Sequence, residues 1–311
     1  MSQPSSPPRR VAITGASGMI GGALSRALVQ RGDQVVHLVR RGASADVGEG
    51  VTEAPWDPGA GRLDPAALEG VDAVVHLAGA GLGERRWTQD YKNTIRASRV
   101  AGTTTVSGAV AARCPIPRLV SASAIGIYGD RGNDVLTEES RTGSGFLAEV
   151  CRDWEAATWQ AQEHGGSVAH ARSGIVLSPE GGAMARVMPL AKFGLAGPLG
   201  SGKQYWSWIT LRDEIRALMF LIDRPDITGA VNLTGPHPDT QTDVVRALGE
   251  RLRRPTLLPA PTVALRIALG EMASEILGSQ RVLPTVLTEA GFEHDHPDLG
   301  TAVAWLVDQD G

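Results

Sequence analysis

The stretch Arg10-Val-Ala-Ile-Thr-Gly-Ala-Ser-Gly-Met-Ile-Gly21 decides the fold class of this 311-residue chain. A short β-rich run ends in closely spaced glycines, and residues 19–30 continue with the periodicity of a helix. Strand, glycine turn and helix form the first unit of a parallel sheet. In such a unit Gly15 permits a tight turn, Gly18 lets a pyrophosphate approach the backbone and Gly21 allows close helix–strand packing. The stretch therefore predicts a dinucleotide site.

The following residues continue the alternation of strands and helices. We expect strands at 34–39, 72–77, 117–121 and 167–172, a short helix from Asp64, and long helices at 88–113 and 145–164. This order predicts an α/β fold with a Rossmann-type, doubly wound parallel sheet. Beyond Ile175 the alternation breaks into loops rich in glycine and proline. We expect a disordered tail at 1–8, a dinucleotide-binding domain at 9–175 and a smaller C-terminal substrate part at 176–311, with some interleaving.

The composition narrows the class of protein. Hydrophobic residues make up 42% and charged residues 21%, as in an ordinary soluble globular protein. Thirty cations against 34 anions give a net charge of −4, which argues against nucleic acid or a membrane as the main partner. Two cysteines cannot build a disulfide framework or a cysteine-rich zinc site, and we expect no metal. No segment resembles a signal peptide or a membrane span, so we expect a cytoplasmic location.

The end of the second strand indicates which dinucleotide is bound. An NAD site typically carries an acid at this point, whereas this chain has Arg40 and Arg41. Guanidinium groups suit a 2′-phosphate, although a solvated charge pair would explain them too. We therefore expect NADP(H). Besides the glycines and these arginines, the expected cofactor contacts are Ser17, Met19, Ile20, Leu77, Ala78, Gly79, Ser121, Cys151 and Arg172.

Three motifs in this order resemble those of an extended short-chain dehydrogenase/reductase, the family of sugar-nucleotide epimerases and dehydratases. They are Thr14-Gly-x-x-Gly-x-x-Gly21, Asp72-Ala-Val-Val-His-Leu-Ala-Gly79 and Ser121-Ala-Ser-Ala-Ile-Gly-Ile-Tyr-Gly129. Residues 84–87, 146–155, 197–208 and 281–284 further resemble an atypical subgroup of epimerase family proteins with a C-terminal domain of unknown function, some labelled cell-division inhibitors. The resemblance covers nearly the whole chain and implies the scaffold without fixing an activity.

The chain departs from the parent family at the chemistry. The resemblance implies a Tyr-x-x-x-Lys pair whose tyrosine is the general acid/base, but the matching positions hold Leu147 and Cys151. Arg99 stands where the family usually has an active-site asparagine. Loss of such a proton donor costs roughly 10²- to 10⁴-fold in rate. A reaction in this protein must take its proton elsewhere or need none.

Four side chains are candidates for the missing chemistry. Ser123 matches the family's upstream serine and could bind a substrate oxygen or the nicotinamide amide, with Ser121 as its competitor. Arg99 could supply positive charge to an oxyanion or to the cofactor, unless it forms a surface salt bridge. Cys151 could act as a nucleophile or proton donor, although a free cysteine is usually buried. Tyr128 could be a replacement acid pointing into the cleft, or a packing residue.

Three further residues are candidates for substrate binding. Arg86 and Trp87 could clamp an anionic or planar substrate, with surface charge and a buried indole as the alternative. Trp208 could line the cleft or anchor the core. Two functions remain open. One is an NADP(H)-dependent oxidoreductase or epimerase acting on a small polar molecule, and the other is a non-catalytic NADP(H)-binding regulator of a protein partner. A homodimer is compatible with both.

Overall fold

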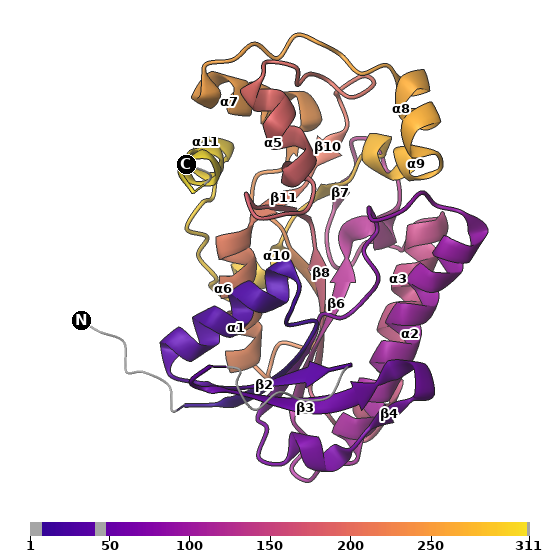
Figure 1. Ribbon diagram of the computed structural model, residues 1–311, viewed down its shortest axis with the longest axis vertical. Helices are drawn as coiled ribbons and strands as arrows, with labels where there is room; N and C mark the ends of the chain where they lie inside the picture. Colours follow the sequence, from indigo (N-terminus) through magenta and orange to yellow (C-terminus); the bar gives the residue numbers. More distant parts are fainter. Residues whose placement is uncertain (1–7, 41–47, 310–311) are drawn as a thin grey trace.

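A single large sheet organises the protein in the computed structural model, which describes residues 8–40 and 48–309. Helices cover both faces of this eight-stranded sheet, so the predicted Rossmann-type α/β fold is confirmed (Figure 1). Neighbouring strands are parallel except for β3 and β4. In spatial order they are β12 (Gly229–Leu233), β8 (Val168–Ser173), β6 (Arg118–Ala124), β5 (Ala73–His76), β1 (Arg10–Thr14), β2 (Gln34–Val39), β3 (Val51–Asp57) and β4 (Arg62–Leu63).

Each face of the sheet has its own hydrophobic core. Helices α1 (Met19–Arg31) and α6 (Leu211–Asp223) lie on one side, and α2 (Gln89–Ala111), α3 (Phe146–Ala156) and α4 (Trp159–Glu163) lie on the other (Figure 1). Successive residues of β1 alternate between the cores, because side chains of a strand point to opposite faces. Val11 and Ile13 join the α1–α6 core, while Ala12 joins the core beneath α2. Burial on both faces explains the continuous apolar run in this strand.

Local side-chain bonds set several helix boundaries. Thr88 caps α2 as expected, since its Oγ1 accepts from Tyr91 N at 3.2 Å. The helix predicted from Asp64 is a single 3₁₀ turn, Pro65–Leu68. The helix predicted over 145–164 is two helices, α3 and α4. Between them the Thr158 hydroxyl bonds the Glu155 carbonyl at 2.8 Å, an alternative partner for the helix backbone.

Residues beyond 175 build the smaller elements and complete the large sheet. Strand β12 and helix α6 come from this region, so the two parts interleave, while the expected domain boundary at 175 stays a prediction. The remaining 3₁₀ turns are Pro58–Ala60 and Ile125–Tyr128. The short strand pairs are β7 (Val135–Leu136) with β14 (Arg281–Val282), β9 (Ile175–Leu177) with β11 (Trp208–Thr210), and β10 (Tyr205–Trp206) with β13 (Asp239–Thr240). The remaining helices are α5 (Met184–Lys192), α7 (Gln241–Leu252), α8 (Thr262–Leu269), α9 (Met272–Leu277), α10 (Thr285–Glu289) and α11 (Leu299–Asp308).

Candidate functional site

Two glycines of the loop between β1 and α1 have no room for a side chain. Gly15 has a φ of +72°, and a Cβ there would lie 3.0 Å from Ala78 N. A Cβ on Gly21 would lie 2.3 Å from Gly15 O, closer than any real contact. No side chain caps the N-terminus of α1 at Gly18. Its first N–H groups therefore point outward from a tight backbone cradle, an arrangement that fits a pyrophosphate.

A buried hydroxyl joins the carboxyl ends of β1 and β5. Thr14 Oγ1 accepts hydrogen bonds from Leu77 N at 3.1 Å and Ala78 N at 3.2 Å, and it lies 2.7 Å from His76 Nδ1. With both N–H groups donating to the oxygen, its own proton goes to Nδ1. Burial, with a contribution from the charge of Arg99, lowers the pKa of His76 to about 4. The imidazole is neutral, and the contact holds Leu77 and Ala78 against the glycine loop.

Arg99 lies beside this edge, where backbone carbonyls and an aromatic ring surround its guanidinium. Its Nη1 donates to the carbonyls of Ala80 at 2.9 Å and Ile95 at 3.2 Å, and its guanidinium carbon lies 4.9 Å from the centre of the Trp154 ring. Within residues 8–40 and 48–309, no carboxylate lies within ion-pair distance of Arg99. Burial lowers the pKa of Arg99, but a guanidinium stays charged at neutral pH. Its Nε and Nη2 therefore offer charge and hydrogen bonds to an incoming oxygen.

A buried polar network lies under the ends of β6, β8 and β12. The Glu155 carboxylate accepts from Ser123 Oγ at 2.7 Å and from Nε and Nη2 of Arg172, both at 2.8 Å. Arg172 Nη1 donates to the Tyr128 hydroxyl at 2.9 Å, which donates to Asn232 Oδ1 at 2.8 Å. Burial acts to raise the pKa of Glu155, but the hydrogen bonds and charge of Arg172 outweigh it and the pKa is lowered.

This network contains three of the residues proposed from the sequence. Tyr128 has no exposed surface, and burial raises its pKa, which favours the packing role over an acid that points into the cleft. Ser123 gives its single proton to Glu155, so toward a ligand its oxygen can only accept a hydrogen bond, and its expected role stays a prediction. Arg172 is buried, and all three of its guanidinium nitrogens bond to protein, while its expected contact with the cofactor stays a prediction. Sequence reasoning did not single out Glu155 within the segment 146–155, and it missed Asn232 because no motif marks it.

Cys151 is a buried thiol. It packs with Ile125, Ile127 and Leu136. Burial, followed by the charge of Glu155, raises its pKa to about 12. The thiolate is the nucleophilic form of cysteine, so this environment disfavours a nucleophilic role at neutral pH. The expected contact of Cys151 with the cofactor stays a prediction.

The two tryptophans predicted to bind substrate are core residues. Trp208 is buried, and its indole N–H donates to Asp239 Oδ2 at 2.9 Å. Trp87 is buried against Phe146, with ring centroids 5.2 Å apart. Indoles have the largest apolar surface of any side chain, and in this structure both indoles pack in the interior. Arg86 is exposed beside Gly270, and its substrate role stays a prediction.

The remaining cofactor candidates divide by exposure. Ser17, Gly18 and Gly79 are exposed, and the expected contacts at Met19, Ile20, Leu77 and Ala78 are partly exposed. Ser121 has no exposed surface, and its expected contact with the cofactor stays a prediction. Arg40 is exposed at the end of β2, whereas Arg41 lies outside the described residues.

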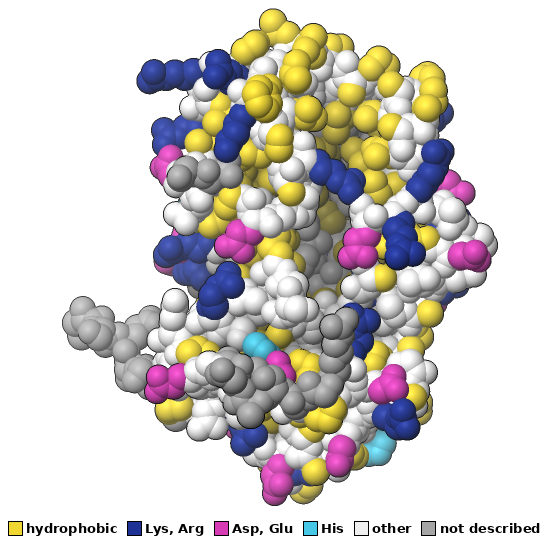
Figure 2. All heavy atoms as spheres, in the orientation of Figure 1, with side chains coloured by type: hydrophobic (Ala, Val, Ile, Leu, Met, Phe, Trp, Pro, Cys, Tyr) yellow, Lys and Arg dark blue, Asp and Glu magenta, His cyan; other side chains and the backbone are white. Residues whose placement is uncertain are grey.

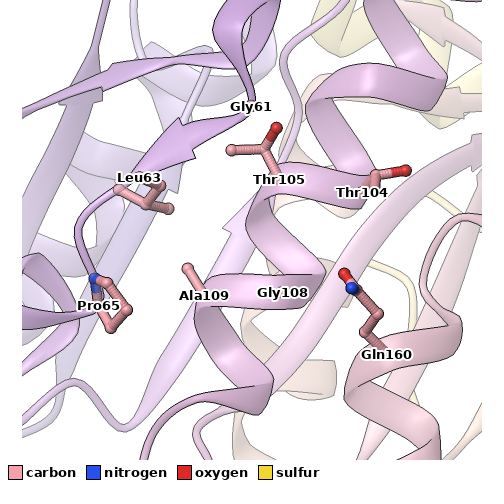
Figure 3. Close-up of a pocket in the computed structure, with 8 residues that line it drawn as sticks. All are labelled: Gly61, Leu63, Pro65, Thr104, Thr105, Gly108, Ala109 and Gln160. Atoms are coloured by element: carbon pink, nitrogen blue, oxygen red, sulfur yellow. The ribbon is translucent and has the colours of Figure 1, made fainter.

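The surface around these groups is hollowed between the C-terminal part and the sheet (Figure 2). Across the hollow, Arg186 of α5 donates to the Gly83 carbonyl in the loop after β5. A separate pocket of about 300 Å³ lies between β4 and α2 (Figure 3). Thr104, Thr105 and Gln160 are the polar residues that line it, and none of its lining residues is titratable. The pocket therefore lacks acid/base groups, and the candidate site remains at the carboxyl ends of the strands, where ligands of open α/β sheets bind.

Comparison with known proteins assigns the family. Residues 11–234 match the family model described as the NAD dependent epimerase/dehydratase family. The chain belongs to this family. The matched segment contains the glycine loop, Arg99 and the whole Glu155 network. Residues 260–306 match a second model, described only as a domain of unknown function, DUF1731. The resemblance found in the sequence is thus confirmed, including its C-terminal part.

Relatives support the same assignment. An epimerase family protein of Mycobacterium bovis is 45% identical over 302 residues, covering 97% of this chain and 98% of its own. The Arabidopsis thaliana protein named epimerase family protein SDR39U1 homolog, chloroplastic, is 37% identical, covering 91% of this chain and 82% of its own. The expected cytoplasmic location stays a prediction. In the part of the chain that the structure describes, no helix combines the length and apolar character that crossing a bilayer requires.

Two solved structures share the fold over nearly the whole chain. Human epimerase family protein SDR39U1 (isoform 2), solved with NADPH, superposes with a TM-score of 0.86 at 27% identity, covering 96% of this chain and 99% of its own. A nucleoside-diphosphate sugar epimerase from Corynebacterium glutamicum gives a TM-score of 0.77 at 34% identity, covering 96% of this chain and 58% of its own. Both resemble this protein in fold and sequence.

Proposed function

We propose that this protein is an NADP(H)-dependent oxidoreductase or epimerase acting on a small polar carbonyl or alcohol, with Arg99 in place of the missing tyrosine–lysine pair. The observation that carries the proposal is the environment of Arg99, a partly buried guanidinium beside the end of β5 with no carboxylate partner among the described residues. A cation in such a site is costly unless an anion or an oxyanion completes it.

Three observations support the cofactor assignment, and the last two of them favour its phosphorylated form. The Gly15–Gly21 cradle and the uncapped N-terminus of α1 fit a pyrophosphate. At the end of β2 the chain has the exposed Arg40 instead of the acid that an NAD site uses. The human relative was solved with NADPH. The cationic strand end therefore favours a dinucleotide that carries a 2′-phosphate.

The chemistry divides between the cofactor and Arg99. When bound, the cofactor supplies or accepts the hydride. Arg99 Nε and Nη2 would donate hydrogen bonds to the substrate oxygen as negative charge develops on it. Arg99 cannot give up a proton at neutral pH, and Tyr128 and Ser123 are held in the buried network. The proton therefore comes from solvent in this proposal, and the rate should show no ionisation typical of a tyrosine–lysine pair.

The first experiment is a calorimetric titration of the full chain with NADPH and, separately, with NADH. We expect tighter binding of NADPH, and an Arg40→Ala variant should lose this preference. Arg62→Ala is the matched control, because Arg62 is exposed at the edge strand β4 and pairs with Asp57. Equal binding of the two dinucleotides to the wild-type protein would refute the assignment to NADP(H).

The second experiment screens carbonyl compounds by NADPH oxidation. Turnover would support an enzyme. Tight NADPH binding without turnover of any carbonyl or alcohol would favour the regulator instead, and the next measurement would be capture of a protein partner with and without NADPH. Capture that ignores the dinucleotide would count against that alternative as well.

A further inference from the structure

One end of the molecule carries a concentrated apolar surface. Helix α8 has the sequence Thr-Val-Ala-Leu-Arg-Ile-Ala-Leu, yet none of its residues is buried. Phe193 is 80% exposed, Leu257 82% and Ile267 70%. Hydrophobic side chains gather over α5 and α8 at the top of the space-filling view (Figure 2). The apolar face consists of Leu190, Phe193, Leu195, Leu257, Leu258, Val263 and Ile267.

The apolar face is built on segments that hold one another. A Cβ on Gly194 would lie 3.2 Å from Pro255 Cδ, so the loops carrying Phe193 and Leu257 touch. Ala260 N donates to Pro198 O at 2.8 Å, and Gly200 N donates to Ala260 O at 2.9 Å. These bonds connect the loop after α5 to the segment that enters α8. The exposed side chains thus sit on a fixed surface.

The two segments that carry the apolar face are rich in cations. Residues 181–203 and 251–270, which carry all of it, contain no aspartate or glutamate. They contain seven cations, namely Arg186, Lys192, Lys203, Arg251, Arg253, Arg254 and Arg266. Arg251 pairs with Asp308, and Arg186 donates to the Gly83 carbonyl. The expectation of no membrane contact rested on the net charge of −4 for the whole chain. That sum does not reveal that these two segments are cationic.

We propose that the apolar face docks on an anionic lipid bilayer. Phe193, Leu257 and Ile267 would enter the boundary between head groups and acyl chains, and the surrounding cations would meet lipid phosphates. Surfaces of peripheral membrane proteins combine apolar side chains with lysine and arginine. Burial of the apolar side chains and attraction to anionic lipids both increase the affinity for the bilayer. A fluid bilayer accepts side chains from two loops and a helix without a matching shape.

A second copy of the chain fits the same surface less well. A two-fold contact through the apolar face would place the cations of one copy against the same cations of the other. An anionic bilayer instead supplies the opposite charge to all of them. An acidic protein would also supply negative charge, but it would need pockets fitted to the protruding Phe193 and Leu257.

Vesicle flotation with the full chain tests the proposal. We expect binding to phosphatidylcholine vesicles that contain phosphatidylglycerol, at least tenfold weaker binding to phosphatidylcholine alone, and weakening with added salt. A Phe193→Ser/Leu257→Ser double variant should lose at least tenfold in binding to the anionic vesicles, and Arg253→Gln/Arg254→Gln should lose severalfold. The control is Trp159→Ser on α4, an equally apolar change at a side chain that is 48% exposed far from the apolar face.

Three results would overturn the proposal. The first is the absence of binding to anionic vesicles. The second is binding that the Phe193→Ser/Leu257→Ser variant retains in full. The third is a dimer of the wild-type protein in sedimentation velocity that the double variant does not form, together with no binding of the protein to vesicles. This result would assign the apolar face to a second copy of the chain. Thermal unfolding of each variant shows that these surface changes leave the fold intact.

Discussion

The guanidinium of Arg172 meets the carboxylate of Glu155 in a bidentate contact, Nε to Oε1 and Nη2 to Oε2, with both hydrogen bonds at 2.8 Å. The contact joins β8 to α3 under the candidate site. Ser123 of β6 binds the same carboxylate, and Tyr128 extends the network to Asn232 of β12. One carboxylate therefore fixes the positions of several strand ends.

Removing the charge of Glu155 should destabilise the protein strongly. Glu155→Gln leaves the Arg172 guanidinium buried without its anion, a change that costs about 3–5 kcal/mol in buried pairs. Urea unfolding measures the free energy of unfolding. The control is Glu149→Gln on the same helix, where the carboxylate is 52% exposed and pairs with Arg96. That change should cost less than about 1 kcal/mol. Equal effects of the two substitutions would contradict the role given to Glu155.

Replacing Arg99 should separate chemistry from cofactor binding. Arg99→Met keeps an aliphatic contact with Trp154 but removes the charge, so turnover should fall by roughly 10²- to 10³-fold while NADPH affinity changes little. Arg99→Lys should recover part of the rate. Arg96→Ala, one turn away and paired on the surface with Glu149, is the control. The assay is NADPH oxidation with the best carbonyl from the screen, and full activity in Arg99→Met would remove Arg99 from the proposal.

Two neighbouring glycines should respond differently to alanine. In Gly21→Ala the new Cβ would lie 2.3 Å from Gly15 O, a backbone atom that cannot move cheaply. We expect a loss of roughly 1–3 kcal/mol in stability from such overpacking, together with weakened dinucleotide binding. In Gly22→Ala the Cβ would lie 3.3 Å from Ala16 O, which needs only a small shift. Calorimetric titration should find nearly normal NADPH binding in that variant, and a similar defect in both would contradict the predicted cradle.

Glu214 should make stability depend on pH near neutrality. This buried side chain on α6 accepts from Ser173 at 2.6 Å through Oε1, and no described residue binds Oε2. Burial raises its pKa from 4.5 to about 7. The folded state therefore holds a proton that the unfolded state releases, and stability falls as pH rises from 4.5 to 7.

Glu214→Gln removes this titration. The variant should gain stability over the wild-type protein by a small amount at about pH 5 and by about 3 kcal/mol at about pH 8, since one pKa unit equals about 1.4 kcal/mol. Urea unfolding at both values measures the difference. A gain that does not grow with pH would show that Glu214 titrates normally in the folded protein.

The strands, helices and glycine loop of the scaffold could be predicted from the sequence because each depends mainly on nearby residues. The glycine spacing after β1 and the apolar run of β2 need no distant partner to be interpreted. The direction of a side chain does depend on distant partners. Tyr128 follows a strand end and could face the cleft or the core, and the acceptor that holds it inward, Asn232, lies more than 100 residues later.

The candidate site shows the same division. The departure of Arg99 from the family pattern is visible in the sequence, but only the fold shows that no carboxylate among the described residues pairs with it. Glu155 is one of several acids on an amphipathic helix, so nothing in its spacing distinguishes it from the exposed Glu149. Trp208 could line a ligand site or a core, and the choice depends on Asp239 as the acceptor for its indole.

Strand β12 has a consequence for biosynthesis. It pairs with β8, but the ribosome synthesises it more than 50 residues after β8. Until residues 229–233 emerge, β8 presents an unpaired edge, which is a template for aggregation. A nascent chain that already contains the complete glycine loop therefore still depends on later residues to close its sheet. Fragments ending near residue 175 should consequently need a chaperone, or an added strand, to stay in solution.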